Sequence, residues 1–270
     1  MSLWLCRQER VNRPFLVEPL GIHLYSSQEL SYVIYHYPLL VLDGFVGENL
    51  FTFLREELNH GFLALKLERW MKSNEDPDEV LILILQECDY YTAVEIAKYR
   101  QRITDLRKKH PAEFKKLKAD ELFSMRQYGR AVKLYQELVD EPSDEFVNDQ
   151  FKGRVWNNMG SCYARMFRFS EAMGAFEVAY LRTGQKEILE RIYALTQLDD
   201  RLRLGDRLNA LISEDMKKEW DEHLEAARKK AAQSEQIGQL NLLFQKDSIR
   251  RQEGEAALLK KWKNEYRSMV

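Results

Sequence analysis

The stretch WNNMGSCYARMFRFSEAMGAFEVAY, residues 156–180, decides the fold of this chain. It holds small and aromatic residues at fixed offsets, among them Trp156, Gly160, Tyr163, Ala172 and Phe176. Small residues let two helix backbones approach closely, and aromatic rings fill the space beside them. We therefore predict two antiparallel helices, over about 153–166 and about 170–182, with Gly160 and Ala172 where the backbones meet.

The same offsets resemble the tetratricopeptide repeat, W-x2-L-G-x2-Y followed by A-x3-F-x2-A. The matching residues are Trp156, Met159, Gly160, Tyr163, Ala172, Phe176 and Ala179, with Met in place of Leu. Phe169 takes the place of the aromatic residue that precedes the second helix. The resemblance implies an all-α fold, a right-handed α-solenoid in which helical hairpins stack on copies of themselves.

A second copy lies upstream, in FKKLKADELFSMRQYGRAVKLYQELV. Ala131 aligns with Ala172 at a separation of 41 residues, which is seven more than the repeat period of about 34. The polar loop around Pro142 accounts for the extra residues. Weaker copies occur at 90–100 and 187–198. We therefore predict repeats over 76–211, with the best copies at 112–140 and 153–183.

The rest of the chain also favours helices. Only 12 Gly and 6 Pro interrupt it, and apolar residues almost nowhere alternate over the length of a strand. We predict a helical N-terminal module over 1–75, in which Ser27 caps one helix and Asp43 begins another. The second helix has an apolar face, formed by Phe45, Leu50, Phe53, Leu54 and Leu58.

Residues 212–270 are rich in helix formers, and we expect them to form a long capping helix or a helical pair. Trp220, Leu224, Ala227 and Ala231 have a spacing similar to that of a coiled coil. Gly238 and Gly254 are expected to mark bends. Homo-oligomerisation through these helices is a further possibility.

Composition bounds the class of protein. The chain carries 41 basic and 43 acidic side chains, so no overall field attracts it to nucleic acid or to an anionic membrane. The longest aliphatic run, LILIL at 81–85, is far shorter than the roughly 20 residues of a membrane span. Cys6, Cys88 and Cys162 are odd in number and far apart, unlike a secreted disulfide framework. We expect a cytoplasmic protein without a membrane anchor.

The sequence lacks the usual catalytic motifs: it has no glycine-rich phosphate loop, no CxxC, no HExxH and no GxSxG. Glu57 and His60 have the spacing of a di-iron ligand pair, but a second such pair is missing. His23 and His36 lie among aromatic residues, where partly buried structural histidines are expected. Cys162 is expected to be a buried packing residue. We predict no enzymatic activity, no cofactor and no metal.

The resemblance implies a binding surface, because the first helices of tetratricopeptide hairpins line a concave groove that receives peptides or partner helices. The residues placed there by this register are Lys116, Asp120, Phe123, Arg154, Asn157, Asn158, Ser161 and Arg165. Family members that clamp a C-terminal carboxylate use Lys and Asn at positions matched by Lys116 and Asn158. Asp120 departs from that pattern because it would repel a carboxylate, and Ile188 and Ile192 stand where cations are wanted.

We predict a scaffold that binds a peptide or helix of another protein. The layout also resembles uncharacterised bacterial proteins with a small helical module before their repeats. The alternative is a peptide-sensing transcription regulator, since some bacterial regulators join a DNA-binding head to such repeats. Residues 1–75 hold seven basic and nine acidic side chains, however, and this balance argues against DNA binding by the head.

Overall fold

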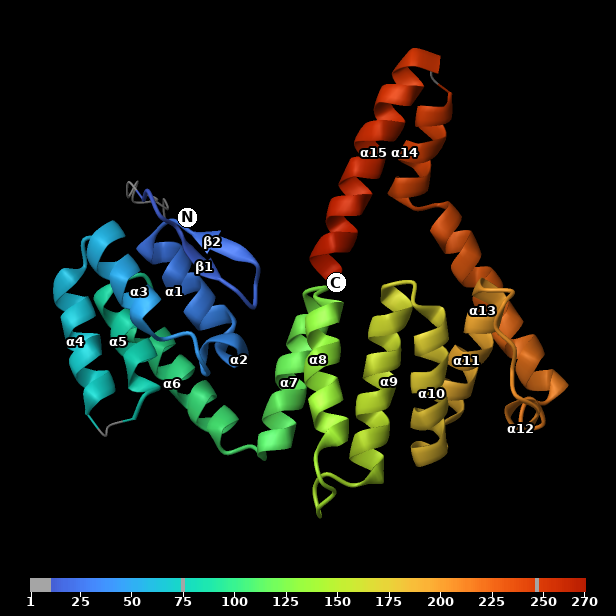
Figure 1. Ribbon diagram of the computed structural model, residues 1–270, viewed down its shortest axis with the longest axis horizontal. Coiled ribbons are helices and arrows are strands. Elements are labelled where there is room, and N and C mark those ends of the chain that lie inside the picture. Colours follow the sequence, from blue (N-terminus) through green and yellow to red (C-terminus); the bar gives the residue numbers. More distant parts are fainter. Residues whose placement is uncertain (1–10, 74–75, 246–247) are drawn as a thin grey trace. The chain divides into compact units, whose positions relative to one another are not determined.

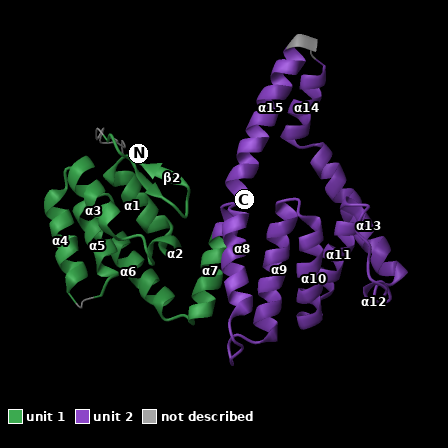
Figure 2. Cartoon of the chain, viewed as in Figure 1, with its two compact units in different colours: residues 1–121 green, residues 122–270 purple. Residues whose placement is uncertain are grey.

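The computed structural model describes residues 11–73, 76–245 and 248–270, with the side chains of 248 and 249 excepted. The chain is mostly helical, as predicted (Figure 1). It divides into two compact units, residues 1–121 and residues 122–270 (Figure 2). The division into 1–75, 76–211 and 212–270 stays a prediction. In the described part, no helix is long and apolar enough to cross a membrane.

The N-terminal module is not purely helical, and this part of the prediction was wrong. Two short strands, β1 (Phe15–Val17) and β2 (Ile22–Leu24), pair antiparallel, with Val17 opposite Ile22. Gly21 closes their turn at a φ of 66°, in the left-handed region that glycine adopts without strain. Strands of three residues are too short to show the alternation that identifies a strand in a sequence.

The first helix of unit 1, α1 (Ser27–His36), is capped one residue earlier than predicted. The Ser26 hydroxyl accepts the N–H of Glu29 at 3.1 Å, while Ser27 is buried in the first turn. Five further helical segments follow before helix α6 (Ala93–Arg107), which is described below. They are α2 (Pro38–Val41), α3 (Glu48–Thr52), the π-helix η1 (Phe53–Glu57), α4 (Gly61–Lys72) and α5 (Glu79–Glu87).

Asp43 does not begin a helix, which corrects a second prediction. The chain enters α3 at Glu48, and the Asp43 carboxylate instead accepts a hydrogen bond from Arg107 at 3.0 Å. Arg107 ends α6 (Ala93–Arg107) and also pairs with the buried Asp78, its Nε lying 2.7 Å from Oδ2. The predicted apolar face is confirmed as buried, at Phe45, Leu50, Phe53, Leu54 and Leu58.

In unit 2 the predicted helical hairpin of residues 153–182 is confirmed. It consists of α9 (Asp149–Arg165) and α10 (Phe169–Thr183). The two helices run antiparallel, because Asp149 at the start of α9 forms an ion pair with Arg182 near the end of α10. Gly160 faces the ring of Phe176, where an added Cβ would lie 2.7 Å from Cδ1.

Helix α9 also packs against α8 (Tyr128–Asp140), and α10 packs against α11 (Lys186–Leu198), so that the four helices form one layered row (Figure 1). The preceding helix, α7 (Pro111–Ser124), crosses the boundary between the two units. Helices therefore occur where both repeat copies are predicted. The solenoid of tetratricopeptide type stays a prediction.

The C-terminal residues form more helices than predicted. After α12 (Asp206–Asn209), they are α13 (Glu214–Ala232), α14 (Glu235–Phe244) and α15 (Ser248–Met269). The Trp220 ring is buried 5.5 Å from the ring of Tyr193 on α11, whereas Ala227 and Ala231 are exposed. Only the first turns of the predicted apolar seam are therefore covered.

Gly238 and Gly254 do not mark bends, which corrects the prediction made for them. Gly238 lies inside α14 and Gly254 inside α15. Gly254 leaves room for Leu243, since an added Cβ would lie 2.2 Å from its Cδ1. The far end of α15 reaches the turn after α9, where the Tyr266 hydroxyl lies 3.5 Å from the carbonyl oxygen of Met166.

Candidate functional site

The candidate site is one face of α9, which we call the α9 stripe and define by its residues Arg154, Asn157, Asn158, Ser161 and Arg165. The opposite face of the helix carries the apolar residues, and they are buried: Val155, Met159 and Cys162. Their spacing of three and four residues matches the helical period. The sequence therefore buries one side of α9 and turns the residues of the α9 stripe away from the core.

The α9 stripe combines exposed cations with partly buried amides. Arg154 and Arg165 are exposed near the two ends of the stripe, and Asn157, Asn158 and Ser161 lie half-buried between them. The Ser161 hydroxyl donates to the carbonyl oxygen of Asn157 at 3.0 Å. The side-chain amide of Asn157 donates to Oδ1 of Asn158 at 3.4 Å. These hydrogen bonds hold the amides in place between the two guanidinium groups.

A further residue joins the stripe from the neighbouring helix. Arg191 of α11 donates a hydrogen bond from Nη1 to Oδ1 of Asn157. Its guanidinium also lies 6.0 Å from the centre of the Phe176 ring, within the range of a cation–π contact. Arg191 was not among the predicted groove residues. The signal was present, because Arg191 follows Asn157 by 34 residues, the period of the repeat.

The electrostatic character of this face is positive. Arg154, Arg165 and Arg191 supply three guanidinium groups, and the α9 stripe itself contains no carboxylate. Arginine stays protonated at every physiological pH, and its planar fork of donors matches a carboxylate. The face is therefore suited to a partner that offers a carboxylate and backbone carbonyl groups.

Three of the predicted groove residues have other surroundings. Nζ of Lys116 and Oδ2 of Asp120 lie 2.7 Å apart on α7, so the two charges offset one another. Both residues belong to unit 1, whereas the α9 stripe belongs to unit 2. The ring of Phe123 packs 5.3 Å from the ring of Tyr128, at the turn between α7 and α8. The structure thus places five of the eight predicted residues on α9 and the other three on α7.

Two of the positions that depart from the carboxylate-clamp pattern belong to the core. Ile188 and Ile192 are almost fully buried on α11. They share an apolar cluster with Phe176, Leu189 and Trp220. Side chains in this cluster cannot reach a ligand on the surface, so the cationic contribution of α11 comes from Arg191 instead.

The remaining candidates for chemistry are histidine, cysteine and glutamate side chains. Among the described residues, no group of three or more His, Cys, Asp or Glu side chains is placed to hold a metal ion. Oε2 of Glu57 accepts the N–H of Asn12 at 2.7 Å. Cys162 is buried, as predicted, and Cys6 lies outside the described residues. His23 and His36 are exposed, so the expectation that they are partly buried was wrong.

Comparisons with protein-family models, with curated proteins and with solved structures gave no match to this chain. The resemblance to tetratricopeptide repeats therefore depends on the residues of the chain and on the helical hairpin that α9 and α10 form.

Proposed function

We propose that this protein is a non-enzymatic interaction scaffold that binds a peptide or a helix of another protein along the α9 stripe. The observation that carries the proposal is the hydrogen bond from Arg191 to Asn157. It joins the polar faces of α9 and α11, two alternate helices of the row. A segment of another chain lying across both helices would meet amides and cations together.

The recognition chemistry follows from the side chains. The amides of Asn157 and Asn158 can pair with the backbone of an extended peptide, which carries unsatisfied donors and acceptors. The guanidinium groups of Arg154 and Arg165 can form charge-assisted hydrogen bonds with an acidic side chain or a carboxylate. Because these cations are exposed, they contribute most to the rate and selectivity of association, and their effect falls with added salt.

The proposal is tested by affinity capture with the double variant Asn158→Ala, Arg165→Ala. A matched control replaces the same residue types on α12, as Asn209→Ala, Arg207→Ala, where both residues are exposed. We expect the stripe variant to lose its partner and the control to keep it. Circular dichroism of both proteins establishes that the helices persist. Capture that is unchanged in the stripe variant would remove this face as the binding site and leave the fold as it is.

A further inference from the structure

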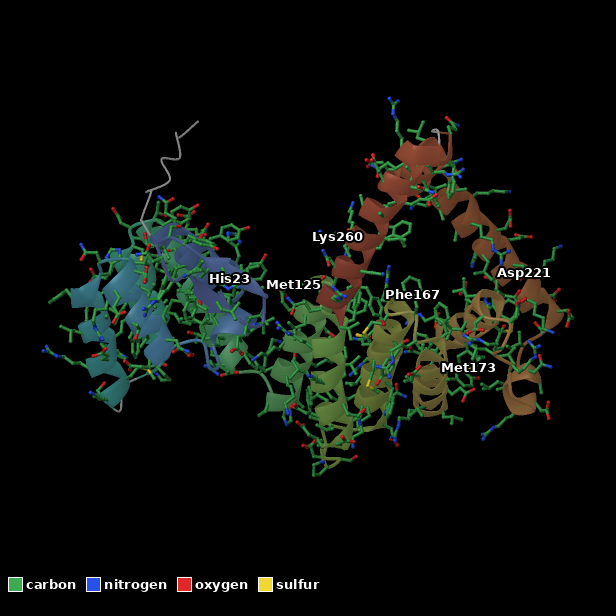
Figure 3. The ribbon with its side chains drawn as sticks, turned by 45° about the horizontal axis from the view of Figure 1, so that its top comes forward. His23, Met125, Phe167, Met173, Asp221 and Lys260 are labelled. Carbon is green, nitrogen blue, oxygen red and sulfur yellow. The ribbon has the colours of Figure 1, made fainter. Side chains whose placement is uncertain are left out.

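Unit 1 contains a hollow that the proposed function does not use. It lies between strand β2 and helix α1, has a volume of about 500 Å³, and falls in the size range of ligand pockets. Figure 3 marks its position by His23, which lies on β2. The residues that give the hollow its chemistry are Ile22, His23, Tyr25, Glu29, Tyr32 and Tyr90.

Tyrosine rings dominate the exposed lining. Tyr25 is 51% exposed and Tyr32 is 46% exposed, although large aromatic side chains are among those whose burial stabilises a fold most. Behind them the rings pack together. The centre of the Tyr32 ring lies 4.2 Å from that of His36, and the Tyr35 ring stacks on Tyr91 at 4.1 Å. This packing limits the motion of the lining, and rigid aromatic side chains lose little entropy when they bind a partner.

Among the described residues that line the hollow, Glu29 is the one with a formal charge. Its Oε2 accepts the backbone N–H of Tyr25 at 2.5 Å, which fixes the carboxylate at the start of α1. A carboxylate has lone pairs for further donors, so a cation can bind it in addition. A ligand with a negative charge would meet this carboxylate, and the described part of the lining holds no lysine or arginine to offset it.

Two classes of occupant fit poorly. An added β-strand needs free backbone groups along an edge, but β2 has three residues and the N–H of Tyr25 just beyond it is already bound by Glu29. Single-stranded nucleic acid also stacks on aromatic rings, yet it requires cations along its phosphate backbone. The lining residues that the structure describes include no lysine or arginine to supply them.

We propose that this hollow binds a proline-rich peptide segment that carries a basic side chain next to its prolines. Such segments form polyproline II helices, whose carbonyl groups are not bonded within the helix and whose order is largely present before binding. Proline rings pack against the faces of Tyr25 and Tyr32, while the tyrosine hydroxyls and the His23 ring can donate to the peptide carbonyls. The basic side chain pairs with Glu29 at the edge of the hollow.

The test uses the full chain and fluorescently labelled synthetic peptides. The probe is a polyproline peptide that ends in arginine, compared with the same peptide ending in glutamate and with a glycine–serine peptide of equal length. We expect saturable binding, measured by anisotropy, that is strongest for the arginine peptide and absent for the glycine–serine peptide. Binding of the glutamate peptide equal to that of the arginine peptide would overturn the role assigned to Glu29.

Variants locate the site. Tyr32→Ala should weaken binding at least about tenfold, as truncation of a central aromatic contact commonly does. Phe62→Ala is the matched control, since Phe62 is an exposed aromatic residue of α4 outside the hollow. Glu29→Gln retains an oxygen that can accept the Tyr25 N–H, and it should abolish the preference for arginine over glutamate.

Amide and ring chemical shifts of the unmodified protein provide a readout that needs no variant. Titration with the arginine peptide should change the chemical shifts of Tyr25, Tyr32 and Tyr90 more than those of other residues. Perturbations centred elsewhere, equal losses in Tyr32→Ala and Phe62→Ala, or tighter binding of an oligothymidine strand would each overturn the proposal.

Discussion

Nη1 of Arg191 on α11 donates a hydrogen bond to Oδ1 of Asn157 on α9, and the two residues are 34 positions apart in the chain. This separation is the period of the tetratricopeptide repeat. The bond therefore joins positions that would be equivalent in successive repeats. It also identifies the place where the polar surface of α9 continues onto α11.

A double-mutant cycle tests that relationship. Asn157→Ala and Arg191→Ala should show a coupling free energy of about 0.5–1.5 kcal/mol in urea unfolding, because they remove one charge-assisted hydrogen bond between partly exposed groups. The comparison cycle pairs Asn157→Ala with Lys186→Ala, whose amine bonds Glu219 instead. Its free energies should add. Additive behaviour in both cycles would show that Arg191 and Asn157 do not interact in solution.

Two glycines of the hairpin should respond in opposite ways to alanine. Gly160→Ala places a Cβ 2.7 Å from the Phe176 ring and should lower the free energy of unfolding by about 1–3 kcal/mol. Gly174 on α10 has no atom within 4 Å of an added Cβ, so Gly174→Ala should raise it by up to about 1 kcal/mol through helix propensity. Denaturant unfolding measures both. Equal effects would mean that α9 and α10 do not meet at Gly160.

Trp220 is the main anchor of α13. Trp220→Ala should lower the free energy of unfolding of unit 2 by about 3–5 kcal/mol, because the indole is almost fully buried in the apolar cluster that contains Ile188 and Ile192 of α11. Trp262 on α15 is 42% exposed, and Trp262→Ala should cost far less. Thermal unfolding gives the difference, and limited proteolysis shows whether residues beyond 213 are released in the first variant only.

The contact of α13 with α11 should also depend on pH. Nδ1 of His223 lies 2.9 Å from Oε1 of Glu190, and this hydrogen bond raises the pKa of His223 above its usual 6.5. A raised pKa in the folded state means that the stabilisation is complete below pH 6.5 and is lost as the pH rises through the folded pKa. NMR titration of His223 should show the raised value. In Glu190→Gln the pKa should return toward 6.5.

Sequence reasoning located the elements best where the pattern is long. The hairpin of α9 and α10 was predicted closely, because Gly160, Ala172 and Phe176 have spacings that suit two helices in contact. The predictions were wrong where an element or a cap depends on only a few residues. The strands β1 and β2 have three residues each, and the cap of α1 lies at Ser26 and not at Ser27, in a pair of identical residues.

The roles of the two C-terminal glycines could not be assigned without knowing which side chains pack against them. Gly238 and Gly254 look alike in the sequence, and both were expected at bends. Gly254 instead faces Leu243 of α14, while Gly238 has no atom within 4 Å of an added Cβ. The same limit applies to charges. Lys116 and Asp120 were both predicted as groove residues, and only the structure shows that their side chains pair with one another along α7.

The sequence by itself determined which residues of α9 share one face, because the repeat that it resembles sets the register and the helical period then fixes the side of each residue. Arg154, Asn158 and Arg165 were placed in this way. Only the tertiary structure decided what lies beside that face. Arg191 reaches Asn157 because α11 packs against α10, and Tyr90 meets Tyr25 and Tyr32 around one hollow although it comes from a later part of the chain. Packing between elements depends on the side chains of both partners at once, and the periodicity of a single helix carries no information about its neighbour.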